Sequence, residues 1–388
     1  QRYRMRGELG RGGMGVVYDS IDTDLRRHVA IKVLHERRNA DRQLDGDSRT
    51  PLQRFIEEAQ ITGQLEHPNI VPVHEIGVDA KKRVYFTMKR VEGESLRDAL
   101  DSMRDGNSES LAKYDHFKLC EIFLKICNAM SFAHSRRVIH RDLKPDNVMV
   151  GRYGEVMVMD WGLAKVMSRE REGTGGSSTT ATFSGHVSTG SGQNTIEGTI
   201  SGTPAYMPPE QARGEISEID ERSDVFALGA LLYELITLVP PFHAKSGKDA
   251  LKRAREYDLK TPKDATDWLA RTGRLPDDSP VAVAAIERAR RYPRELGAIA
   301  MKALSEQKKD RYQSADELAA EVSRFLKGER VLAYRDPPLK ALGKWASRHR
   351  AISATLGAVI IMGLVTGMIV LSMAKSTAEN QAEAEREK

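Results

Sequence analysis

The stretch VIHRDLKPDNV, residues 138–148, decides the fold of this chain. It places Asp142 and Asn147 five positions apart in a short polar loop, which leads into the apolar residues 148–150. A loop held between packed elements can present Asp142 to a hydroxyl group while Asn147 reaches a metal ion. Lys144 lies between them, where an ammonium group can neutralise negative charge on a phosphoryl group in transfer. The alternative is a solvated turn that is only rich in charge.

The eight consecutive residues 140–147, HRDLKPDN, resemble the catalytic loop of the protein-kinase family, whose pattern is H-R-D-L-x-x-x-N. A lone His-Arg-Asp would suit the charged turn, whereas a match over the whole pattern favours the catalytic loop. The resemblance implies an α+β, bilobal fold with a small strand-rich N-lobe, about residues 1–91, and a larger helical C-lobe, about residues 92–328. It also implies that Asp142 and Lys144 are catalytic.

Composition is compatible with this fold. The chain has 388 residues, 40% of them hydrophobic and 30% charged, which is enough to bury the core of two lobes or two domains. Much of the net charge of +5 comes from Lys and Arg between residues 340 and 350, so we interpret it as membrane-proximal. Because no basic stripe interleaved with aromatic residues occurs elsewhere, we expect no nucleic-acid partner.

The two cysteines, Cys120 and Cys127, fall in an apolar stretch with helical periodicity. Seven residues of helix separate their Cα atoms by roughly 10 Å, beyond the ~7 Å limit of a disulfide. We therefore expect two core thiols in a reducing compartment. The first residues are polar and no signal peptide opens the chain. The sequence begins at Gln1 without Met, so we expect it to be a fragment of a longer protein.

Residues 9–18, LGRGGMGVVY, predict two strands joined by a glycine turn. Gly10, Gly12 and Gly15 let backbone N–H groups approach phosphate oxygens. A dinucleotide-binding fold would require a helix after the glycines, but Val16 and Val17 continue as a strand. The pattern resembles the kinase glycine-rich loop. The resemblance implies nucleotide contacts by Leu9, Gly10, Gly12, Gly15, Val17, Ala30, Lys32, Met88, Val91 and Met149.

Lys32 lies in the β-branched run 29–34, where an ammonium group needs a partner. Glu58, in the predicted helix 54–65, matches the αC glutamate of bacterial kinases. Glu57 is the alternative, and it would point about 100° away on the helix. The polar run 37–50 is interpreted as a mobile loop that leads into this helix.

Residues 84–88 predict the last strand before the hinge between the lobes. By resemblance Met88 is the gatekeeper, and residues 89–91 offer backbone groups to adenine. Lys89 and Arg90 depart from the acidic and aromatic residues that are usual there, although backbone atoms make the adenine contacts.

Beyond the hinge, residues 93–96 are predicted to open a helix, and residues 117–135 have helical periodicity. A strand over 156–159 then ends in Asp160-Trp161-Gly162. By resemblance Asp160 and Asn147 hold the Mg²⁺ ions that bridge ATP phosphates, with Mn²⁺ as an alternative. Trp161 stands where the family usually has Phe, and a larger aromatic ring changes the packing against the αC helix.

Residues 169–203 are rich in Gly, Ser and Thr and contain almost no apolar residues. Such a stretch fits a disordered linker, but its position between the two kinase motifs favours a long activation segment. Phosphate on this segment would complement the charge of Arg141. Thr195 and Thr199 are the leading acceptors, and Glu197 is a weak built-in anion. Lys144 and Thr203 occupy positions that mark Ser/Thr specificity in the family.

Structural roles are implied for three further residues of the C-lobe. Glu210 is expected to pair with Arg311, and Asp224 is expected to brace the catalytic-loop backbone from a buried helix. Residues 243–292 are polar and charge-mixed, and we predict helices and loops on the surface of the lobe.

Ala351 to Ala374 contains no charged residue, and a helix of this length exceeds a ~30 Å hydrocarbon core. A buried core helix is the alternative, but the basic residues 344–350 at one end favour a transmembrane helix. They also predict that the preceding region is cytoplasmic. The spacing of Gly363 and Gly367 permits close helix approach, so a homodimer is a candidate partner. Residues 329–350 are then a basic juxtamembrane linker, and residues 375–388 an extracytoplasmic, helix-prone stub.

Together these features predict a membrane-anchored, ATP-dependent Ser/Thr kinase that phosphorylates protein substrates and its own activation segment. One rival is a membrane-anchored pseudokinase that binds partners without turnover. Pseudokinases usually lack Lys32, Asp142 or Asp160, and all three are present here. A second rival is a soluble kinase with a hydrophobic C-terminal helix.

Overall fold

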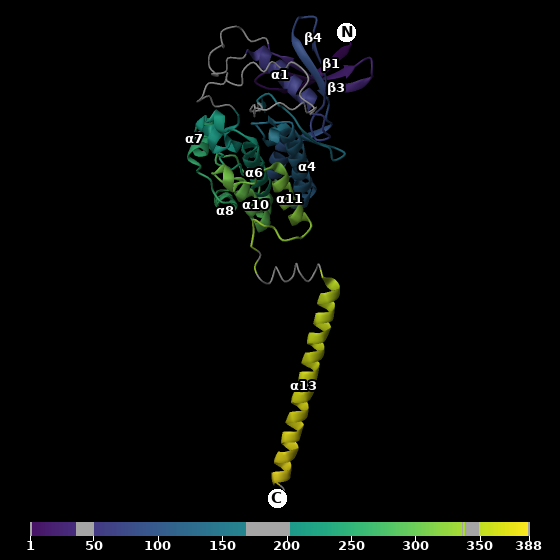
Figure 1. Ribbon diagram of the computed structural model, residues 1–388, viewed down its shortest axis with the longest axis vertical. Helices are drawn as coiled ribbons and strands as arrows, with labels where there is room; N and C mark the ends of the chain where they lie inside the picture. Colours follow the sequence, from purple (N-terminus) through teal and green to yellow (C-terminus); the bar gives the residue numbers. More distant parts are fainter. Residues whose placement is uncertain (1, 36–49, 168–201, 336, 338–348, 387–388) are drawn as a thin grey trace, which may run out of the picture.

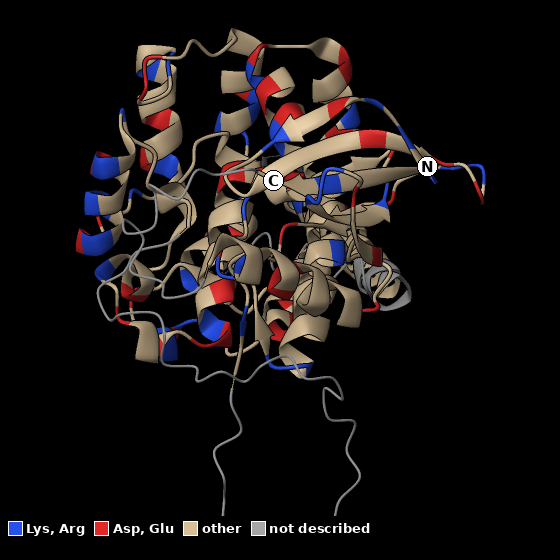
Figure 2. Ribbon diagram, turned by 90° about the horizontal axis from the view of Figure 1, so that it is seen from above, with Lys and Arg blue, Asp and Glu red and all other residues tan. Residues whose placement is uncertain are grey.

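The computed structural model describes residues 2–35, 50–167, 202–335, 337 and 349–386. A strand-rich lobe lies at one end of the molecule, a helical lobe follows it, and a long helix ends the chain (Figure 1). This arrangement confirms the predicted α+β, bilobal fold. Lys, Arg, Asp and Glu are interspersed on the helices and strands of both lobes (Figure 2).

The N-lobe is built on an antiparallel sheet in the order β1-β2-β3-β5-β4. Its strands are β1 (Tyr3–Arg11), β2 (Gly15–Asp22), β3 (Arg27–Leu34), β4 (Val73–Val78) and β5 (Val84–Lys89).

Helix α1 (Pro51–Gln64) covers one part of this sheet. Thr50 caps the helix through a capping box with Gln53, which satisfies backbone donors that a helix start leaves unpaired. The Phe55 ring then packs 5.0 Å from the Phe86 ring of β5. This contact fixes the face that α1 turns toward the sheet.

The C-lobe is helical, and its centre is α6 (Glu221–Thr237). Residues 223–237 are all buried, as expected for a helix surrounded by other helices. Gly229 allows α6 to approach α10, because a Cβ there would overlap Ala303. The other helices are α2 (Leu96–Arg104), α3 (Ser108–Lys113), α4 (His116–Ser135), α5 (Pro209–Arg213), α7 (Gly247–Glu256), α8 (Pro262–Thr272), α9 (Val283–Arg290), α10 (Arg294–Ala303) and α11 (Ala315–Leu326).

Short strands frame the catalytic loop. They form a sheet in the order β6-β8-β9 and a pair β10-β7. Their bounds are β6 (Gly93–Ser95), β7 (Val138–Ile139), β8 (Val148–Gly151), β9 (Val156–Val158) and β10 (Lys165–Val166). The helix predicted to open at residues 93–96 begins at Leu96 with Ser95 as its N-cap, whereas residues 93–95 form a strand that pairs with β8.

The C-lobe also continues further than predicted. Val331 is completely buried, and the Ala333 amide donates to Glu321 Oε2 at 2.9 Å. The lobe therefore extends to about Tyr334 and does not end at residue 328. Cys120 and Cys127 are free thiols buried in α4, as the helical spacing predicted.

Helix α13 (Arg350–Arg386) is long and apolar enough to cross a membrane, and its candidate span is Ala358–Asn380. The predicted transmembrane helix, residues 351–374, lies within α13 and overlaps this candidate span. The helix passes through Ala374 without a break, because the Ala- and Glu-rich residues that follow also favour helix.

Candidate active site

Lys32 stands between two carboxylates that come from different elements. Its Nζ atom lies 2.6 Å from Glu58 Oε1 on α1 and 3.6 Å from Asp160 Oδ1 after β9. Glu58, and not its neighbour Glu57, therefore faces the lysine. Glu58 is buried, whereas half of the Asp160 side chain is exposed.

Lys32 and Asp160 favour each other's charged forms, whereas burial raises the pKa of Glu58 above its ordinary value. Burial alone would lower the pKa of Lys32, but the carboxylates of Glu58 and Asp160 outweigh it and raise that pKa above its ordinary value. Burial likewise works to raise the pKa of Asp160, and Lys32 together with other nearby cations lowers it instead. Lys32 is therefore an ammonium and Asp160 a carboxylate at neutral pH.

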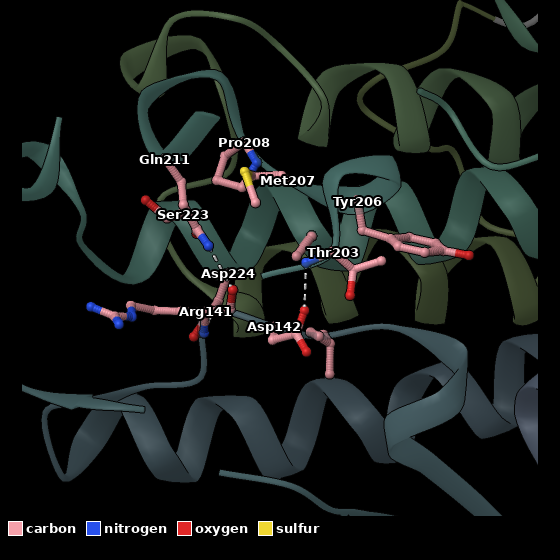
Figure 3. Close-up of a pocket in the computed structure, with 11 residues that line it drawn as sticks. Arg141, Asp142, Thr203, Tyr206, Met207, Pro208, Gln211, Ser223 and Asp224 are labelled. Atoms are coloured by element: carbon pink, nitrogen blue, oxygen red, sulfur yellow. Dashed lines mark hydrogen bonds between the residues drawn. The ribbon is translucent and has the colours of Figure 1, made fainter. Parts of the chain in front are cut away.

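The catalytic loop holds Asp142 in a defined position (Figure 3). The Thr203 amide donates to Asp142 Oδ1 at 2.8 Å, and Lys144 Nζ lies 3.0 Å from Asp142 Oδ2. Lys144 also donates to the Thr203 hydroxyl at 2.7 Å. Two segments 61 residues apart thus meet at one carboxylate.

Asp224 supports this loop from the buried start of α6. Its carboxylate accepts from the backbone amides of His140 at 2.8 Å and Arg141 at 3.0 Å, and His134 Nε2 lies 2.8 Å from it. Burial would raise the pKa of Asp224, but the bonds from His134 and the His140 amide hold it below its ordinary value. Asp224 therefore stays a carboxylate, because its charged form accepts several hydrogen bonds in the buried site.

Left-handed backbone conformations mark both functional segments. Arg141 has a φ of 67° and Asp160 a φ of 58°, which non-glycine residues adopt at some cost. The amides of His140 and Arg141 donate to Asp224 and hold the backbone at Arg141 in this conformation. Strain of this kind indicates that the surrounding fold determines the backbone at Asp160 and at the residue before Asp142.

Asn147 and Asp160 offer hard oxygen ligands on adjoining segments. Asn147 Nδ2 donates to the Asp142 carbonyl at 2.9 Å, which leaves its amide oxygen for another contact. The Met159 amide donates to the Asn147 carbonyl at 2.8 Å and ties the two segments together. Among the described residues no cluster of three His, Cys, Asp or Glu could hold a metal. This donor set suits Mg²⁺, which usually takes one or two protein oxygens and completes its shell with phosphate and water.

The glycine turn is closed by a bond from the Gly12 amide to the Gly15 carbonyl, at 2.9 Å. A Cβ at Gly15 would overlap the Val33 carbonyl, whereas the surroundings of Gly10 and Gly12 are open. Gly15 is thus needed for strand packing, and the other two leave space above the cleft. Leu9, at the end of β1, is half exposed.

The remaining predicted nucleotide contacts lie on the strands and at the hinge. Ala30 of β3 is paired with Met88 of β5, and Val17 of β2 is paired with Lys32. Met149 lies on β8, and Val91 follows β5 in the partly buried hinge.

The hinge is held by its own contacts. The Lys89 amide donates to the Pro72 carbonyl at 3.1 Å, so this amide is already engaged. The side chains of the unusual hinge cations turn to acidic neighbours, with Lys89 4.0 Å from Glu155 and Arg90 3.2 Å from Asp19. The backbone carbonyl of Lys89 can still contact a nucleotide, so the adenine contacts of residues 89–91 stay a prediction.

Trp161 is buried, with its ring centre 4.7 Å from that of His140. Its indole nitrogen has no hydrogen-bond partner in the described part of the chain. The ring therefore contributes packing beneath the catalytic loop. The predicted phosphoacceptors Thr195 and Thr199, with Glu197, lie outside the described residues.

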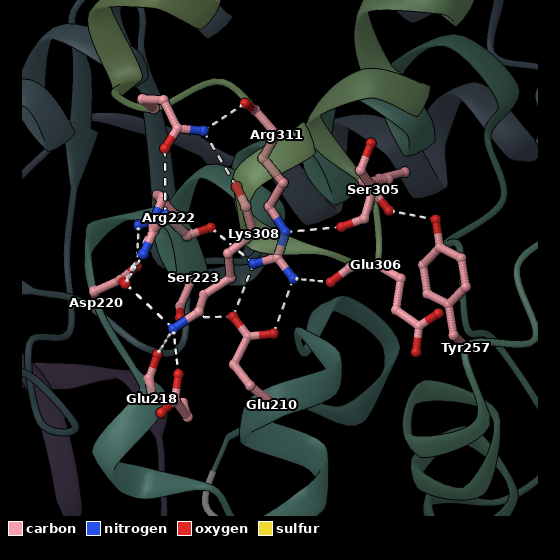
Figure 4. A network of polar contacts seen from close by, with 12 residues as sticks. Glu210, Glu218, Asp220, Arg222, Ser223, Tyr257, Ser305, Glu306, Lys308 and Arg311 are labelled. Atoms are coloured by element: carbon pink, nitrogen blue, oxygen red, sulfur yellow. Dashed lines mark hydrogen bonds and ion pairs between the residues drawn. The ribbon is translucent and has the colours of Figure 1, made fainter.

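Glu210 and Arg311 form a buried pair within a larger polar network (Figure 4). Arg311 donates to both Glu210 oxygens, at 2.8 and 2.9 Å. Ser223 donates to Glu210 as well, at 2.8 Å. The network connects the segment after Thr203 to α6 and to the loop before α11.

Sequence reasoning missed two supporting groups. His134 was treated only as part of a helix, although a histidine near the end of an apolar helix could have suggested a buried acceptor. Glu234 lies in the apolar run of α6 and is contacted by Arg97, Arg104 and Tyr206. Burial opposes its charge, yet the two arginines lower its pKa. The sequence could have indicated this group, because Glu234 is a carboxylate within an otherwise apolar helical run.

Comparisons with known proteins agree with this geometry. A family model described as the protein kinase domain matches residues 3–322. The serine/threonine-protein kinase PknD of Protochlamydia amoebophila is 34% identical over 330 residues, covering 84% of this chain and 30% of that protein. PknD of Chlamydia muridarum is 35% identical over 344 residues, covering 87% of this chain and 33% of that protein.

PknD of Chlamydia trachomatis serovar D is 35% identical over 337 residues, covering 85% of this chain and 32% of that protein. The chain thus spans about a third of the length of the curated relatives it matches. The match over most of the chain, together with the site described above, leads to one conclusion: this chain belongs to the protein-kinase family and is similar to the bacterial serine/threonine kinases named above.

Proposed function

We propose that the chain is a membrane-anchored serine/threonine kinase, which transfers the γ-phosphoryl group of ATP to hydroxyls of cytoplasmic proteins and of its own activation segment. The observation that carries this proposal is the convergence of Lys32 on Asp160, together with the positioning of Asp142 by Thr203 and Lys144. Binding a nucleotide and activating a hydroxyl require these two groups side by side.

The N-lobe residues position the nucleotide. The turn between β1 and β2 supplies backbone N–H groups for the phosphates. Lys32 supplies a positive charge, and its contact with Glu58 positions the ammonium group. Ala30, Val17, Met88 and Met149 are proposed to contact the adenine, with Val91 as the hinge contact.

Asp160 and Asn147 are proposed to hold Mg²⁺, because they offer a carboxylate and an amide oxygen on tied segments. When bound, the ion neutralises charge on the phosphates. Lys32 keeps Asp160 in its charged form, as required of a ligand for a divalent cation.

Asp142 is proposed to orient the acceptor hydroxyl and take its proton. The hydroxyl oxygen bonds to the γ-phosphorus, the bond to the oxygen of the leaving ADP breaks, and the proton passes to Asp142. Lys144, 3.0 Å from Asp142, is placed to steady the phosphoryl group. The contact between Lys144 and Thr203 supports a Ser/Thr acceptor, since these are the positions that mark that specificity.

Helix α13 supports anchoring by one membrane crossing. The basic residues that precede it in the sequence favour a cytoplasmic kinase domain, on the side where ATP is available. Dimerisation through Gly363 and Gly367 stays a prediction.

Mass spectrometry of the full chain after incubation with ATP and Mg²⁺ tests the proposal. We expect phosphate on Ser and Thr only, with Thr195 or Thr199 among the sites. Lys32→Met should lower incorporation on the order of 10³-fold. Phosphotyrosine, or incorporation unaffected by Lys32→Met, would overturn the proposed activity.

A further inference from the structure

The segment that leaves the C-lobe, residues 327–335, is fixed to the lobe, and we call it the exit hook. The Glu329 amide donates to the Arg324 carbonyl at 2.8 Å, and the Ala333 amide donates to Glu321 at 2.9 Å. Between them Val331 is completely buried. A buried side chain between two hydrogen bonds gives the exit hook one conformation on the surface of α11.

The exit hook presents cations and an apolar side chain to solvent. Lys327, Arg330 and Arg335 are exposed, and within the described ranges none of them forms an ion pair. Leu332 lies among them and is 68% exposed. Exposed cations around an exposed leucine are typical of surfaces that rest on anionic membranes.

The net charge of the protein is concentrated here. Residues 327–350 contain seven Lys and Arg against two Asp and Glu, an excess that equals the +5 of the whole chain. The charges of the other residues sum to zero, so this segment carries the net positive charge of the chain. An anionic partner would therefore be attracted to the exit hook and to the residues that follow it.

The sequence keeps the exit hook close to the proposed bilayer. Fourteen residues separate Arg335 from Arg350, the first residue of α13, and an extended chain of this length spans at most about 50 Å. A tether of this length gives the hook a high effective concentration at the membrane surface. Because the potential of anionic lipids is screened within ~8 Å, the cations are attracted only when the hook lies against the headgroups.

We propose that the exit hook binds anionic phospholipid headgroups of the bilayer that α13 crosses, with Leu332 in the interface. This inference rests on the membrane anchoring in the proposed function. The chain leaves the C-lobe at the end remote from the N-lobe sheet (Figure 1). Binding therefore places the base of the C-lobe on the membrane and turns the N-lobe toward the cytoplasm, away from the lipid.

Hydrogen–deuterium exchange on the full chain in lipid nanodiscs tests this arrangement. One set of discs contains phosphatidylcholine alone, and the other contains equal parts of phosphatidylcholine and phosphatidylglycerol. We expect the amides of Arg330, Leu332 and Arg335 to exchange more slowly in the anionic discs. The protection should disappear at about 0.5 M salt, where screening is almost complete.

A triple variant, Lys327→Gln with Arg330→Gln and Arg335→Gln, removes three positive charges from the exit hook. It leaves buried Val331, the two backbone hydrogen bonds and the linker unchanged. Each cation near an anionic surface changes the bound-to-free ratio roughly fivefold, so protection should fall on the order of 100-fold. The matched control neutralises three exposed cations outside the exit hook, two on α7 and one at the end of α9, as Lys248→Gln, Lys252→Gln and Arg291→Gln, and should retain the protection.

Equal exchange in the two kinds of disc, or protection that survives the hook triple variant, would overturn the inference. Protection confined to residues 338–350 would also overturn it, since the linker alone would then bind lipid. Phosphorylation of a Ser/Thr peptide by the same discs is measured in parallel. If the full chain shows slower exchange at the exit hook in anionic discs but does not phosphorylate the peptide, the kinase proposal is contradicted and the lipid contact is retained.

Discussion

Three acidic side chains of the candidate active site differ in their burial and in the groups that contact them. Glu58 is buried against Lys32, Asp160 is half exposed beside the same lysine, and Asp142 is engaged by Thr203 and Lys144. A buried carboxylate that touches one cation suits a positioning role, whereas a half-exposed one can reach a metal ion. The surroundings of each group thus separate their proposed roles.

Glu58→Gln tests the positioning role. The neutral amide should release Lys32 toward Asp160, and the loss of one charge-assisted bond of about 1.5–3 kcal/mol predicts a 10- to 100-fold fall in kcat/KM for ATP. Glu57→Gln on the neighbouring position is the control and should change little. Steady-state kinetics at varied ATP decide this, and equal effects at the two positions would contradict the assignment.

Gly15→Ala tests the close approach of β2 to β3. Its Cβ would overlap the Val33 carbonyl, and overpacking of this kind destabilises by about 1–3 kcal/mol. Because the shift displaces the strand that carries Lys32, the KM for ATP should rise as well. Gly13→Ala, where nothing lies within 4 Å, is the comparison. Urea unfolding and ATP kinetics should separate the two variants, and matching stabilities would refute the packing argument.

At this scale the sequence predicted the residues that match a contiguous pattern, namely Lys32, Asp142, Asn147 and Asp160. It did not predict His134 or the engaged amide of Lys89, because both depend on contacts between distant segments. His134 and Asp224 are 90 residues apart, and no local periodicity links them.

Among the elements, α5 and the loop before α11 are joined through the pair of Glu210 and Arg311. Arg311→Met should destabilise the protein by about 3–5 kcal/mol, because it leaves the buried Glu210 carboxylate without its cation. Arg213→Met breaks a surface pair with Glu306, where both side chains are 37% exposed, and should lower stability by less than about 1 kcal/mol. Urea unfolding measures the stability of both variants. Similar losses of unfolding free energy would contradict the argument that burial makes the pair of Glu210 and Arg311 more important to stability.

Helix α4 begins with a histidine that burial keeps neutral. Burial, aided by Arg288, lowers the pKa of His116 from 6.5 to about 4. The unfolded chain therefore takes up a proton first as the pH falls from 6.5 toward 4, so stability declines in this window and is restored above it. Between pH 7 and pH 5 the wild type should lose about 1–2 kcal/mol more unfolding free energy than His116→Asn. Parallel losses in the two proteins would contradict the shifted pKa.

The elements that sequence periodicity predicted are those with local signals, such as the β-branched run of β3 and the apolar spacing of α4. The strand at residues 93–95 was missed because it is defined by pairing with residues 149–151, far along the chain. The helix continues past Ala374 into the residues that were predicted to be helix-prone, because Ala and Glu favour helix.

For the molecule as a whole, the C-lobe and the proposed membrane anchor are separate units in the sequence. The lobe extends to about Tyr334, and α13 begins at Arg350. The full chain should therefore remain in the membrane fraction after alkaline extraction, whereas a chain ending at Tyr334 should stay in the supernatant and phosphorylate a peptide with the same kcat. Release of the full chain without detergent would favour the soluble-kinase alternative.

The central claim is that Lys32, Asp142, Asn147 and Asp160 form one phosphoryl-transfer site. Phosphate incorporation from labelled ATP into a Ser/Thr protein substrate, compared between the wild type and Asp142→Asn, tests it most directly. The asparagine keeps an oxygen for the Thr203 amide but cannot accept the proton, so we predict a fall of about 10²- to 10⁴-fold with an unchanged melting temperature. Equal incorporation by the two proteins, or none by the wild type, would contradict the account.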